Sequence, residues 1–259
     1  MSNATAPYLC RRASGPVAVD GALGKPAWAQ ALRTPRFVQA ESARPALLET
    51  WAAMLWDDAA LYVAFQLAER DVWSTGQERT ALLWDENAVG ISIAGSGAYY
   101  DLCVNPASRT SELFFVWKDA YRRGGRYDVP EFDLAVHRPM VFGGDAGPAH
   151  PRGMRWGFLD WHFPGLRTAV RVDGTLDQRD DVDRGWSVEI ALPWEGMARL
   201  ADGPLPPRDG EVWPISLVRL QMIDHRAQRY PVVWQPYPLG CTGLPMPDQF
   251  PGVRFAAVA

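Results

Sequence analysis

The sequence predicts an all-β protein, folded as a single antiparallel β sandwich of about ten strands with minimal helix and one long irregular insertion. Three observations support this fold class. Short apolar segments alternate with a period of two, Gly, Pro and Asp residues separate them, and helical patterns are confined to two brief stretches. This combination is typical of sandwiches and unlike the alternation of strands and helices in α/β proteins.

The clearest strand pair covers residues 166–173 and 186–192. In each segment every second residue is apolar, so one face is expected to be buried, and Pro193 ends the second strand. An acidic loop, residues 177–183, connects the two strands. Glu189 lies on the face opposite to the apolar residues, where we expect it to pair with Arg167 or Arg171 on the neighbouring strand.

The remaining elements follow the same logic along the chain. A short strand at 17–19 and a turn at Asp20-Gly21 precede a brief helix that begins at Pro26 and continues to about residue 32. A second short helix is predicted at about 194–200. The other predicted strands are residues 51–56 and 61–67 around an Asp57-Asp58 turn, 89–94 and 99–104 around the turn 95–97, 113–117, 212–220, 232–235 and 252–255.

One domain, residues 17–259, is predicted to contain these strands. Residues 1–16 are expected to be a tag remnant and an N-terminal arm, because Ser2-Asn3-Ala4 has the composition of an expression-tag scar. Periodicity fades over about 118–164, where glycine pairs and prolines interrupt the pattern. An irregular stretch of this length inside a domain is either functional or contains undetected elements.

Composition excludes several classes of partner. The chain has 26 Lys and Arg against 30 Asp and Glu, a net charge of −4, and no basic run, so nucleic-acid binding is not expected. No apolar run is long enough for a transmembrane helix, and the N-terminus lacks a signal-peptide pattern. The widely spaced Cys10, Cys103 and Cys241 are expected to be free thiols. The oligomeric state is left open.

Several short motifs occur in order over nearly the whole chain, from about residue 17 to residue 255. They are Val19-Asp20-Gly21 with Trp28, Trp56-Asp57-Asp58 with 61–64, Trp84-Asp85 with Val89, Tyr100 through Asn105-Pro106, Gly174-Thr175-Leu176, Asp181-Val182-Asp183, 185–194, Trp234 and 247–250. In this order the motifs resemble the family 9 carbohydrate-binding modules and the wider group of DOMON-like β sandwiches.

The resemblance implies a non-catalytic domain that binds a saccharide or glycoside end, outside the cytoplasm in the extracellular or periplasmic space. Sugar C–H faces stack on Trp rings, and the hydroxyls need hydrogen-bond partners. Trp84 corresponds to an aromatic platform and Asn105 to a polar contact. Asp85, Tyr100 and Trp234 complete the predicted ligand-binding set. The alternative for Trp84 is packing beneath a loop, and for Asn105 a hydrogen bond within its own turn.

The sequence departs from the family pattern at three binding positions. Gly90 stands where the family has a glutamate, and Cys103 stands where it has an arginine. The second Trp is missing at Leu244 and Pro245. Altered sugar specificity is therefore expected. Replacement aromatic groups are available among Trp117, Trp156, Trp161, His162, Trp234 and Tyr237.

Alternative functions have weaker signals. Asp177, Asp181 and Asp183 offer oxygen ligands for Ca²⁺, but their spacing is not that of an EF-hand, so a solvated turn is the favoured interpretation. No other cofactor is predicted. A glycoside hydrolase would need two facing carboxylates, for which only Asp85 and Glu86 lie beside an aromatic platform; no enzyme activity is predicted.

Two further alternatives come from the wider DOMON-like resemblance and from the lost binding positions. Some DOMON-like domains bind haem, for which Met54, Met140, Met154 or Met222 with His137 or His162 would supply ligands, but no attachment motif is present. A sandwich that has lost sugar binding would instead serve as a protein-interaction domain. Both alternatives stay open at this point.

Overall fold

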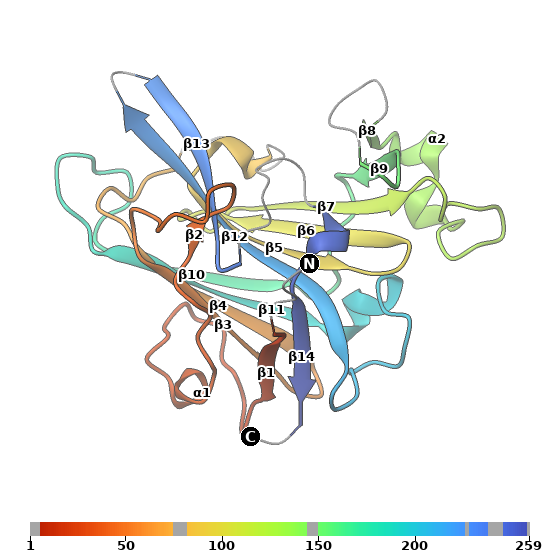
Figure 1. Cartoon of the computed structure of the whole chain (residues 1–259), viewed down its shortest axis with the longest axis horizontal. Helices are drawn as coiled ribbons and strands as arrows, with labels where there is room; N and C mark the ends of the chain where they lie inside the picture. Colours follow the sequence, from red (N-terminus) through yellow and green to blue (C-terminus); the bar gives the residue numbers. More distant parts are fainter. Residues whose placement is uncertain (1–5, 75–81, 144–149, 226–227, 238–245, 258–259) are drawn as a thin grey trace.

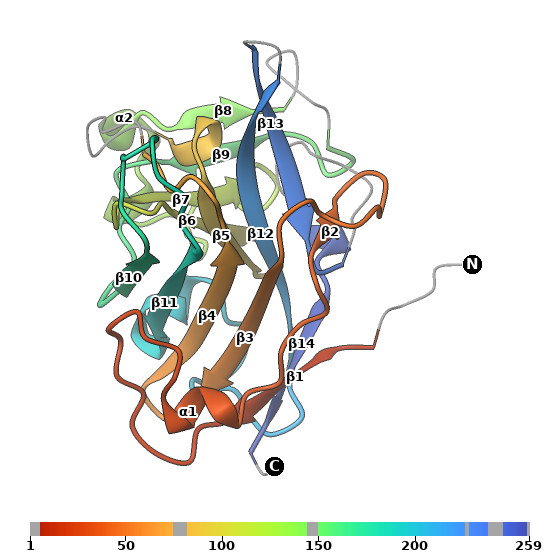
Figure 2. The same ribbon diagram turned by 90° about the vertical axis from the view of Figure 1, so that its left-hand side faces the viewer.

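Two β-sheets face each other and share one long strand, β12 (Val212–His225) (Figures 1 and 2). This computed structural model describes residues 6–74, 82–143, 150–225, 228–237 and 246–257. The predicted all-β sandwich is confirmed, but these residues form fourteen strands instead of about ten. β12 pairs with β14 in sheet A through residues 212–214 and with β5 in sheet B through residues 215–220.

Sheet A contains, in spatial order, β10 (Arg167–Asp173), β11 (Gly185–Pro193), β4 (Ala60–Ala68), β3 (Thr50–Trp56), β1 (Tyr8–Arg12), β14 (Gly252–Ala256) and the start of β12. Sheet B continues from β12 through β5 (Ala88–Ala94), β6 (Ala98–Val104), β7 (Thr110–Trp117), β9 (Arg155–Phe158) and β8 (Met140–Phe142). On its other side β12 pairs with β13 (Gln228–Gln235), which pairs with β2 (Val38–Gln39).

The predicted hairpins are confirmed. β10 and β11 pair antiparallel with Val170 opposite Val188, and β11 continues the sheet by pairing with β4. The turn between β3 and β4 is held by Asp57, whose Oδ1 accepts hydrogen bonds from the backbone N–H groups of Ala59 and Ala60 at 2.8 and 3.0 Å. Aspartate is common in turns because its side chain can bond to nearby backbone in this way.

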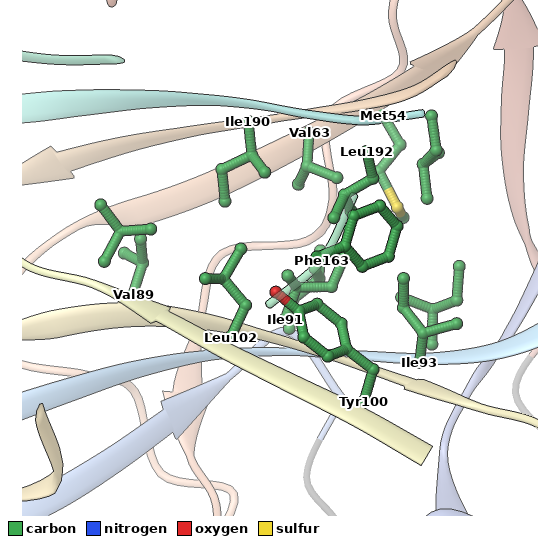
Figure 3. Close-up of a cluster of buried hydrophobic side chains, with 14 of the residues drawn as sticks. Met54, Val63, Val89, Ile91, Ile93, Tyr100, Leu102, Phe163, Ile190 and Leu192 are labelled. Atoms are coloured by element: carbon green, nitrogen blue, oxygen red, sulfur yellow. The ribbon is translucent and has the colours of Figure 1, made fainter. Parts of the chain in front are cut away.

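The main core lies between the two sheets. Val63 and Ile190 of sheet A point toward Val89, Ile91 and Leu102 of sheet B (Figure 3), and all five side chains are fully buried. Burial of each large aliphatic side chain stabilises the fold by roughly 1.5–3 kcal/mol. The apolar residues at every second position of each strand are therefore those that face the opposite sheet.

The N-terminal residues differ from the prediction of an arm over 1–16. Residues 8–12 form β1, which pairs parallel with both β3 and β14. Tyr8 and Cys10 are buried in the core, and the Tyr8 hydroxyl accepts a hydrogen bond from the Met54 N–H at 2.8 Å. The strand predicted at 17–19 does not form; Val17 instead packs against the outer face of sheet A with Trp28.

The insertion at about 118–164 contains two strands that were not predicted. β9 pairs with β7 and β8 pairs with β9, so this segment extends sheet B. It also contains a 3₁₀ turn, η2 (Pro130–Phe132), and a short helix, α2 (Leu134–His137). Strands of three and four residues are too short to establish an alternating pattern, which is why the sequence appeared irregular.

The two predicted helical segments are present in shorter form. The helix α1 (Pro26–Ala29) begins at the predicted proline, and η4 (Trp194–Arg199) is a 3₁₀ turn after β11. A third 3₁₀ turn, η5 (Pro247–Gln249), precedes β14. None of the helices in the described ranges is long and apolar enough to cross a membrane.

Glu189 does not pair with Arg167 or Arg171, as was predicted. Its carboxylate is fully buried and accepts hydrogen bonds from the Trp28 indole N–H and the Gly21 N–H, both at 2.6 Å. The Lys25 ammonium lies 2.7 Å away and completes the arrangement. The N-terminal segment thus covers the outer face of sheet A, which places Glu189 in an interior that sequence alternation would assign to solvent.

Candidate functional site

Trp84 lies on a 3₁₀ turn, η1 (Leu83–Asp85), that crosses the face of sheet B turned away from sheet A. Its ring is half-buried and contacts Phe142 edge to face, with ring centroids 6.3 Å apart. Asp85, the next residue, is exposed. Trp84 and Asp85 therefore lie together near the surface.

Asn105 is fully buried and its amide is engaged within the protein. Its Nδ2 donates to Glu86 at 2.9 Å, and its Oδ1 accepts from the Arg109 N–H at 2.9 Å. The side chain therefore closes its own turn and ties the end of β6 to the segment after η1. Because Glu86 points inward to Asn105 while Asp85 is exposed, these two carboxylates do not face each other across one space.

Gly90 and Cys103, two of the positions where the sequence departs from the family pattern, lie among apolar side chains. A Cβ atom at Gly90 would lie 2.8 Å from Cγ2 of Val218, so the valine fills the space of a longer side chain. Cys103 is buried and clusters with Leu83 and Ala88. Burial raises the pKa of both described thiols, Cys10 and Cys103, well above the usual range, and both are free.

Three positions singled out in the sequence, Cys241, Leu244 and Pro245, lie outside the described residues.

Tyr100 points into the main core instead of toward solvent. Its hydroxyl donates to Glu112 at 2.7 Å, and its ring contacts Trp161 with centroids 5.6 Å apart. Trp117 and Trp161 are also buried, whereas the imidazole of His162 is 78% exposed. The structure therefore separates Tyr100 from Trp84, although both lie on or beside sheet B.

A cleft of about 290 Å³ lies at the end of the sandwich where β4 ends and the β12–β13 hairpin begins. It contains two aromatic residues, the predicted Trp234 and a residue the sequence did not single out, Trp73. The residues that line it are Leu47, Leu48, Glu69, Arg70, Asp71, Trp73, Arg179, Gln221, Met222, Ile223 and Trp234. We call it the end cleft.

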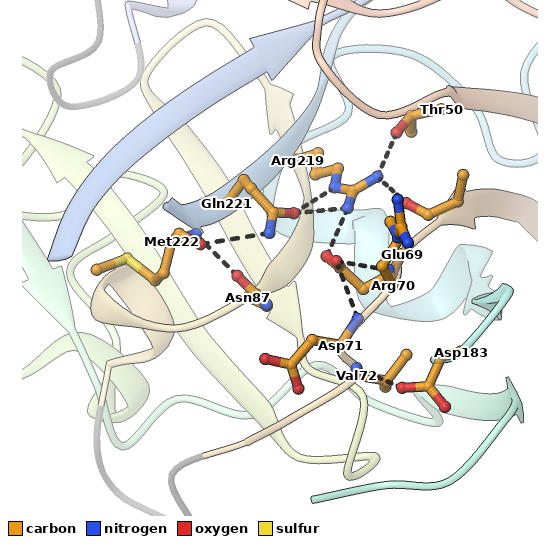
Figure 4. A network of polar contacts seen from close by, with 11 residues as sticks. Thr50, Glu69, Arg70, Asp71, Val72, Asn87, Asp183, Arg219, Gln221 and Met222 are labelled. Carbon is orange, nitrogen blue, oxygen red and sulfur yellow. Dashed lines mark hydrogen bonds and ion pairs between the residues drawn. The ribbon is translucent and has the colours of Figure 1, made fainter. Parts of the chain in front are cut away.

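The floor of the end cleft is a buried polar network centred on Arg219 (Figure 4). Its guanidinium donates to Glu69 at 2.9 Å, to Gln221 and to Thr50, the last at 2.8 Å. It also lies 4.9 Å from the ring centroid of Trp234. Burial lowers the pKa of Arg219 to about 10, and the nearby Glu69 carboxylate opposes this shift, so Arg219 stays protonated at neutral pH.

Two polar atoms in the wall of the end cleft are buried without a hydrogen-bond partner. Among the residues that the structure describes, neither the Trp234 indole nitrogen nor Oδ1 of Asp71 makes a hydrogen bond. The other carboxylate oxygen of Asp71 accepts from Nε of Arg179 at 2.9 Å. The Arg179 guanidinium also lies over the Trp73 ring, 5.4 Å from its centroid. The cleft thus presents one donor and one acceptor beside indole rings.

The carboxylates of the acidic loop bind backbone groups. Asp183 accepts from the N–H groups of Val72 and Thr175, each at 2.7 Å, and Asp177 accepts from the Ser74 N–H at 2.7 Å. Asp181 accepts a hydrogen bond from the Thr175 hydroxyl. No group of three metal-binding side chains occurs within the described part of the chain. Calcium binding at this loop stays a prediction.

The candidate haem ligands are dispersed. Met54 fills the core, Met222 lines the end cleft and Met140 is 40% exposed on β8. His137 is held by Asp160 at 2.6 Å and by the carbonyl of Pro130 at 2.8 Å, and these contacts raise its pKa. His162 lies beside Glu112 at 3.3 Å. Met54, Met140 and Met222 thus lie in three different parts of the described structure.

Comparison with known proteins places the fold. No protein-family model matches the sequence, and no curated protein matches it. A family 9 carbohydrate-binding module from Caldicellulosiruptor kristjanssonii, solved with cellotriose, has 13% identity and a TM-score of 0.52, covering 97% of this chain and 95% of that one. The same organism's family 9 module solved with glucose has 12% identity and a TM-score of 0.50, covering 97% of both chains.

A crystal structure from Bacteroides uniformis, of a protein proposed to bind carbohydrate, has a TM-score of 0.60 at 12% identity and covers 95% of this chain and 97% of that one. At these identities the similarity establishes a shared fold. The predicted resemblance to family 9 carbohydrate-binding modules is therefore confirmed at the level of the sandwich architecture.

Proposed function

We propose that this domain binds a saccharide end in the end cleft without chemical conversion. The observation that carries the proposal is that two residues lining the cleft have polar atoms without a partner, the donor Trp234 Nε1 and the acceptor Asp71 Oδ1, and that Trp73 lines the same cleft. A sugar hydroxyl both donates and accepts, and the C–H face of the ring packs on indole. A volume of about 290 Å³ is at the small end of ligand pockets, which suits one terminal sugar.

The fold supports the same class of ligand. Two of the similar structures were solved with cellotriose and glucose. In this chain Gly90 and Cys103 stand where the family has polar binding residues, and apolar side chains occupy the space around both. Saccharide contacts must therefore come from other residues. This difference is the basis for proposing altered specificity. A saccharide ligand also fits an extracellular or periplasmic location.

Trp84 and Asp85 extend the proposed site. The segment that follows η1 is joined to the cleft wall, because Asn87 Oδ1 accepts a hydrogen bond from the N–H of Met222 at 2.8 Å (Figure 4). Met222 itself lines the cleft. We propose that Trp84 stacks on a second sugar unit outside the cleft and that Asp85 binds its hydroxyls.

Titration calorimetry with a panel of mono- and oligosaccharides tests the proposal. Trp234→Phe removes the indole N–H and keeps a ring, and we expect at least about tenfold weaker binding. Trp84→Ala should weaken oligosaccharides more than monosaccharides. Trp51→Ala is the matched control, because Trp51 is a half-buried Trp on β3 whose ring stacks with Arg33, outside the cleft-lining set.

Thermal unfolding of each variant separates lost binding from lost folding. Equal affinity of wild type and Trp234→Phe would reject the end cleft as the site. Absence of binding to any saccharide by the wild type, together with a stable oligomer in solution, would favour the alternative of an interaction domain.

A further inference from the structure

A second feature, distinct from the end cleft, is a buried arginine on the outer face of sheet B. Arg155 begins β9 and is 1% exposed. Its guanidinium carbon lies 4.9 Å from the ring centroid of Trp117, 5.6 Å from that of Tyr99 and 5.8 Å from that of Phe115. Tyr99 and Phe115 stack at 4.3 Å, so the cation rests on a continuous aromatic surface.

The charge of Arg155 has no ionic partner within the described residues. None of the ion pairs between described residues includes it, and its Nε and Nη1 atoms are buried without a hydrogen-bond partner there. The hydroxyl of Tyr99 is buried and unbonded in the same way. By contrast, the other buried arginine, Arg219, is paired with Glu69 and bonded to Gln221.

Such an arrangement is energetically incomplete. A guanidinium stays protonated at any physiological pH, and burying it without an anion costs several kcal/mol. The cation–π interaction with aromatic faces offsets only about 0.5–2 kcal/mol of this cost. Three donors, Arg155 Nε, Arg155 Nη1 and Tyr99 Oη, therefore lack acceptors in one place, which is the pattern of a site that receives an anionic group from outside.

The neighbouring groups favour a single negative charge. His150 packs against Trp117 with ring centroids 4.5 Å apart, and burial together with the charge of Arg155 lowers its pKa, so it is neutral near pH 7. Arg152, on the rim, is already paired with Asp119 at 3.1 Å. Nε2 of His150 lies 3.8 Å from the carboxylate of Asp248, and the Asp248 side chain is exposed to solvent.

We propose that Arg155 binds the carboxylate of a small ligand, with the Tyr99 hydroxyl donating to the same group. One unpaired cation is neutralised by a monoanion, whereas a phosphate dianion would leave one buried negative charge unbalanced. This site uses none of the residues of the end cleft and does not depend on the proposed saccharide binding there.

The direct test is the side-chain Nε–H signal of Arg155 in ¹H–¹⁵N NMR spectra of the intact chain. The probes are sodium glucuronate, sodium acetate, glucose and inorganic phosphate at equal ionic strength. We expect saturable shifts of the Arg155 signal with glucuronate and acetate and none with glucose. Unchanged signals with both carboxylates would overturn the proposal, and tighter binding of phosphate would overturn the assignment to a carboxylate.

Two variants give a second readout. Arg155→Met keeps the side-chain length and removes the charge, so it should weaken glucuronate binding about tenfold or more while leaving the melting temperature equal or higher. Arg152→Met is the matched control and should bind glucuronate like the wild type. Wild-type affinity in Arg155→Met would overturn the proposal. If that variant does not fold, the NMR titration of the wild type decides alone.

Discussion

The carboxylate of Glu189 accepts a hydrogen bond from the indole N–H of Trp28 at 2.6 Å, across 161 residues of chain. The same carboxylate accepts from the Gly21 N–H at 2.6 Å and lies 2.7 Å from Lys25 Nζ. The Asp20 N–H also donates to it, at 2.8 Å, so a single carboxylate on β11 satisfies four donors of the N-terminal segment. Its burial is tolerated because each of its contacts is a charge-assisted hydrogen bond.

Glu189→Gln should destabilise the protein by roughly 3–5 kcal/mol. The substitution leaves the Lys25 ammonium without its partner in a partly buried position and places an amide group against other donors. Urea unfolding followed by tryptophan fluorescence measures the change. Glu195→Gln, at an exposed position after β11, is the control and should unfold like the wild type. Similar stability of both variants would contradict the role assigned to Glu189.

The Arg219–Glu69 pair should show strong energetic coupling. Both side chains are buried, at 1% and 6% exposure, so Arg219→Met leaves the Glu69 carboxyl group buried without its partner and should cost about 3–5 kcal/mol. The double variant Arg219→Met/Glu69→Leu should recover much of this loss, because no unpaired charge remains. A double-mutant cycle by urea unfolding gives the coupling energy. Arg184→Met, in an exposed pair with Asp173, should cause no measurable change.

Stability should depend on pH through Asp101. Burial raises its pKa to about 6, and the Ser92 hydroxyl, which donates at 2.5 Å, opposes the shift. A raised carboxyl pKa means that the native state holds the proton more tightly, so this group's contribution is fully present below about pH 4 and is lost as pH rises to about 6.

Asp101→Asn should therefore match wild-type stability near pH 4 and exceed it by about 3 kcal/mol near pH 7. Urea unfolding at a series of pH values tests this difference. Asp85→Asn, the same substitution at an exposed position, is the control. A constant offset for Asp101→Asn would show that this carboxyl does not titrate as described.

Gly185 should not tolerate a side chain. Its φ of +145° is disfavoured for other residues, and a Cβ atom would lie 1.9 Å from the carbonyl oxygen of Leu67 on β4. Gly185→Ala should cost about 1–3 kcal/mol from backbone conformation alone, and more from the clash. Gly15→Ala is the control, because its Cβ would meet no atom within 4 Å. Melting temperatures of the two variants provide the comparison.

Much of the fold was predictable because a strand with one buried face has apolar residues at every second position of its sequence. The alternation that includes Val170 and Val188 identified β10 and β11, and Asp57 identified the turn between β3 and β4. β1 was missed because it forms only with partners from elsewhere in the chain: Cys10 pairs with Phe255, which is 245 residues distant. Local patterns do not contain such pairings.

The site was less predictable than the fold. Trp84 lies near the surface, as the resemblance implied. The Tyr100 side chain points into the main core, because Tyr100 is one of the alternate residues of β6 that face the other sheet. Trp234 was singled out, whereas Trp73 carried no motif and is recognised only through its position in the end cleft. Arg155 lay in a segment without periodicity, so its aromatic surroundings appear only once β7 and β9 are paired.

The shared strand β12 has a mechanical consequence for the sandwich. Because residues 212–214 pair in sheet A and residues 215–220 pair in sheet B, the two sheets cannot separate as independent leaves without breaking this strand. Amide protons of its central residues are then released to solvent only when the whole domain unfolds. We therefore expect the two sheets to keep their relative orientation when a ligand binds in the end cleft or at Arg155. Selectivity then depends on the side chains of each site and not on a change in the angle between the sheets.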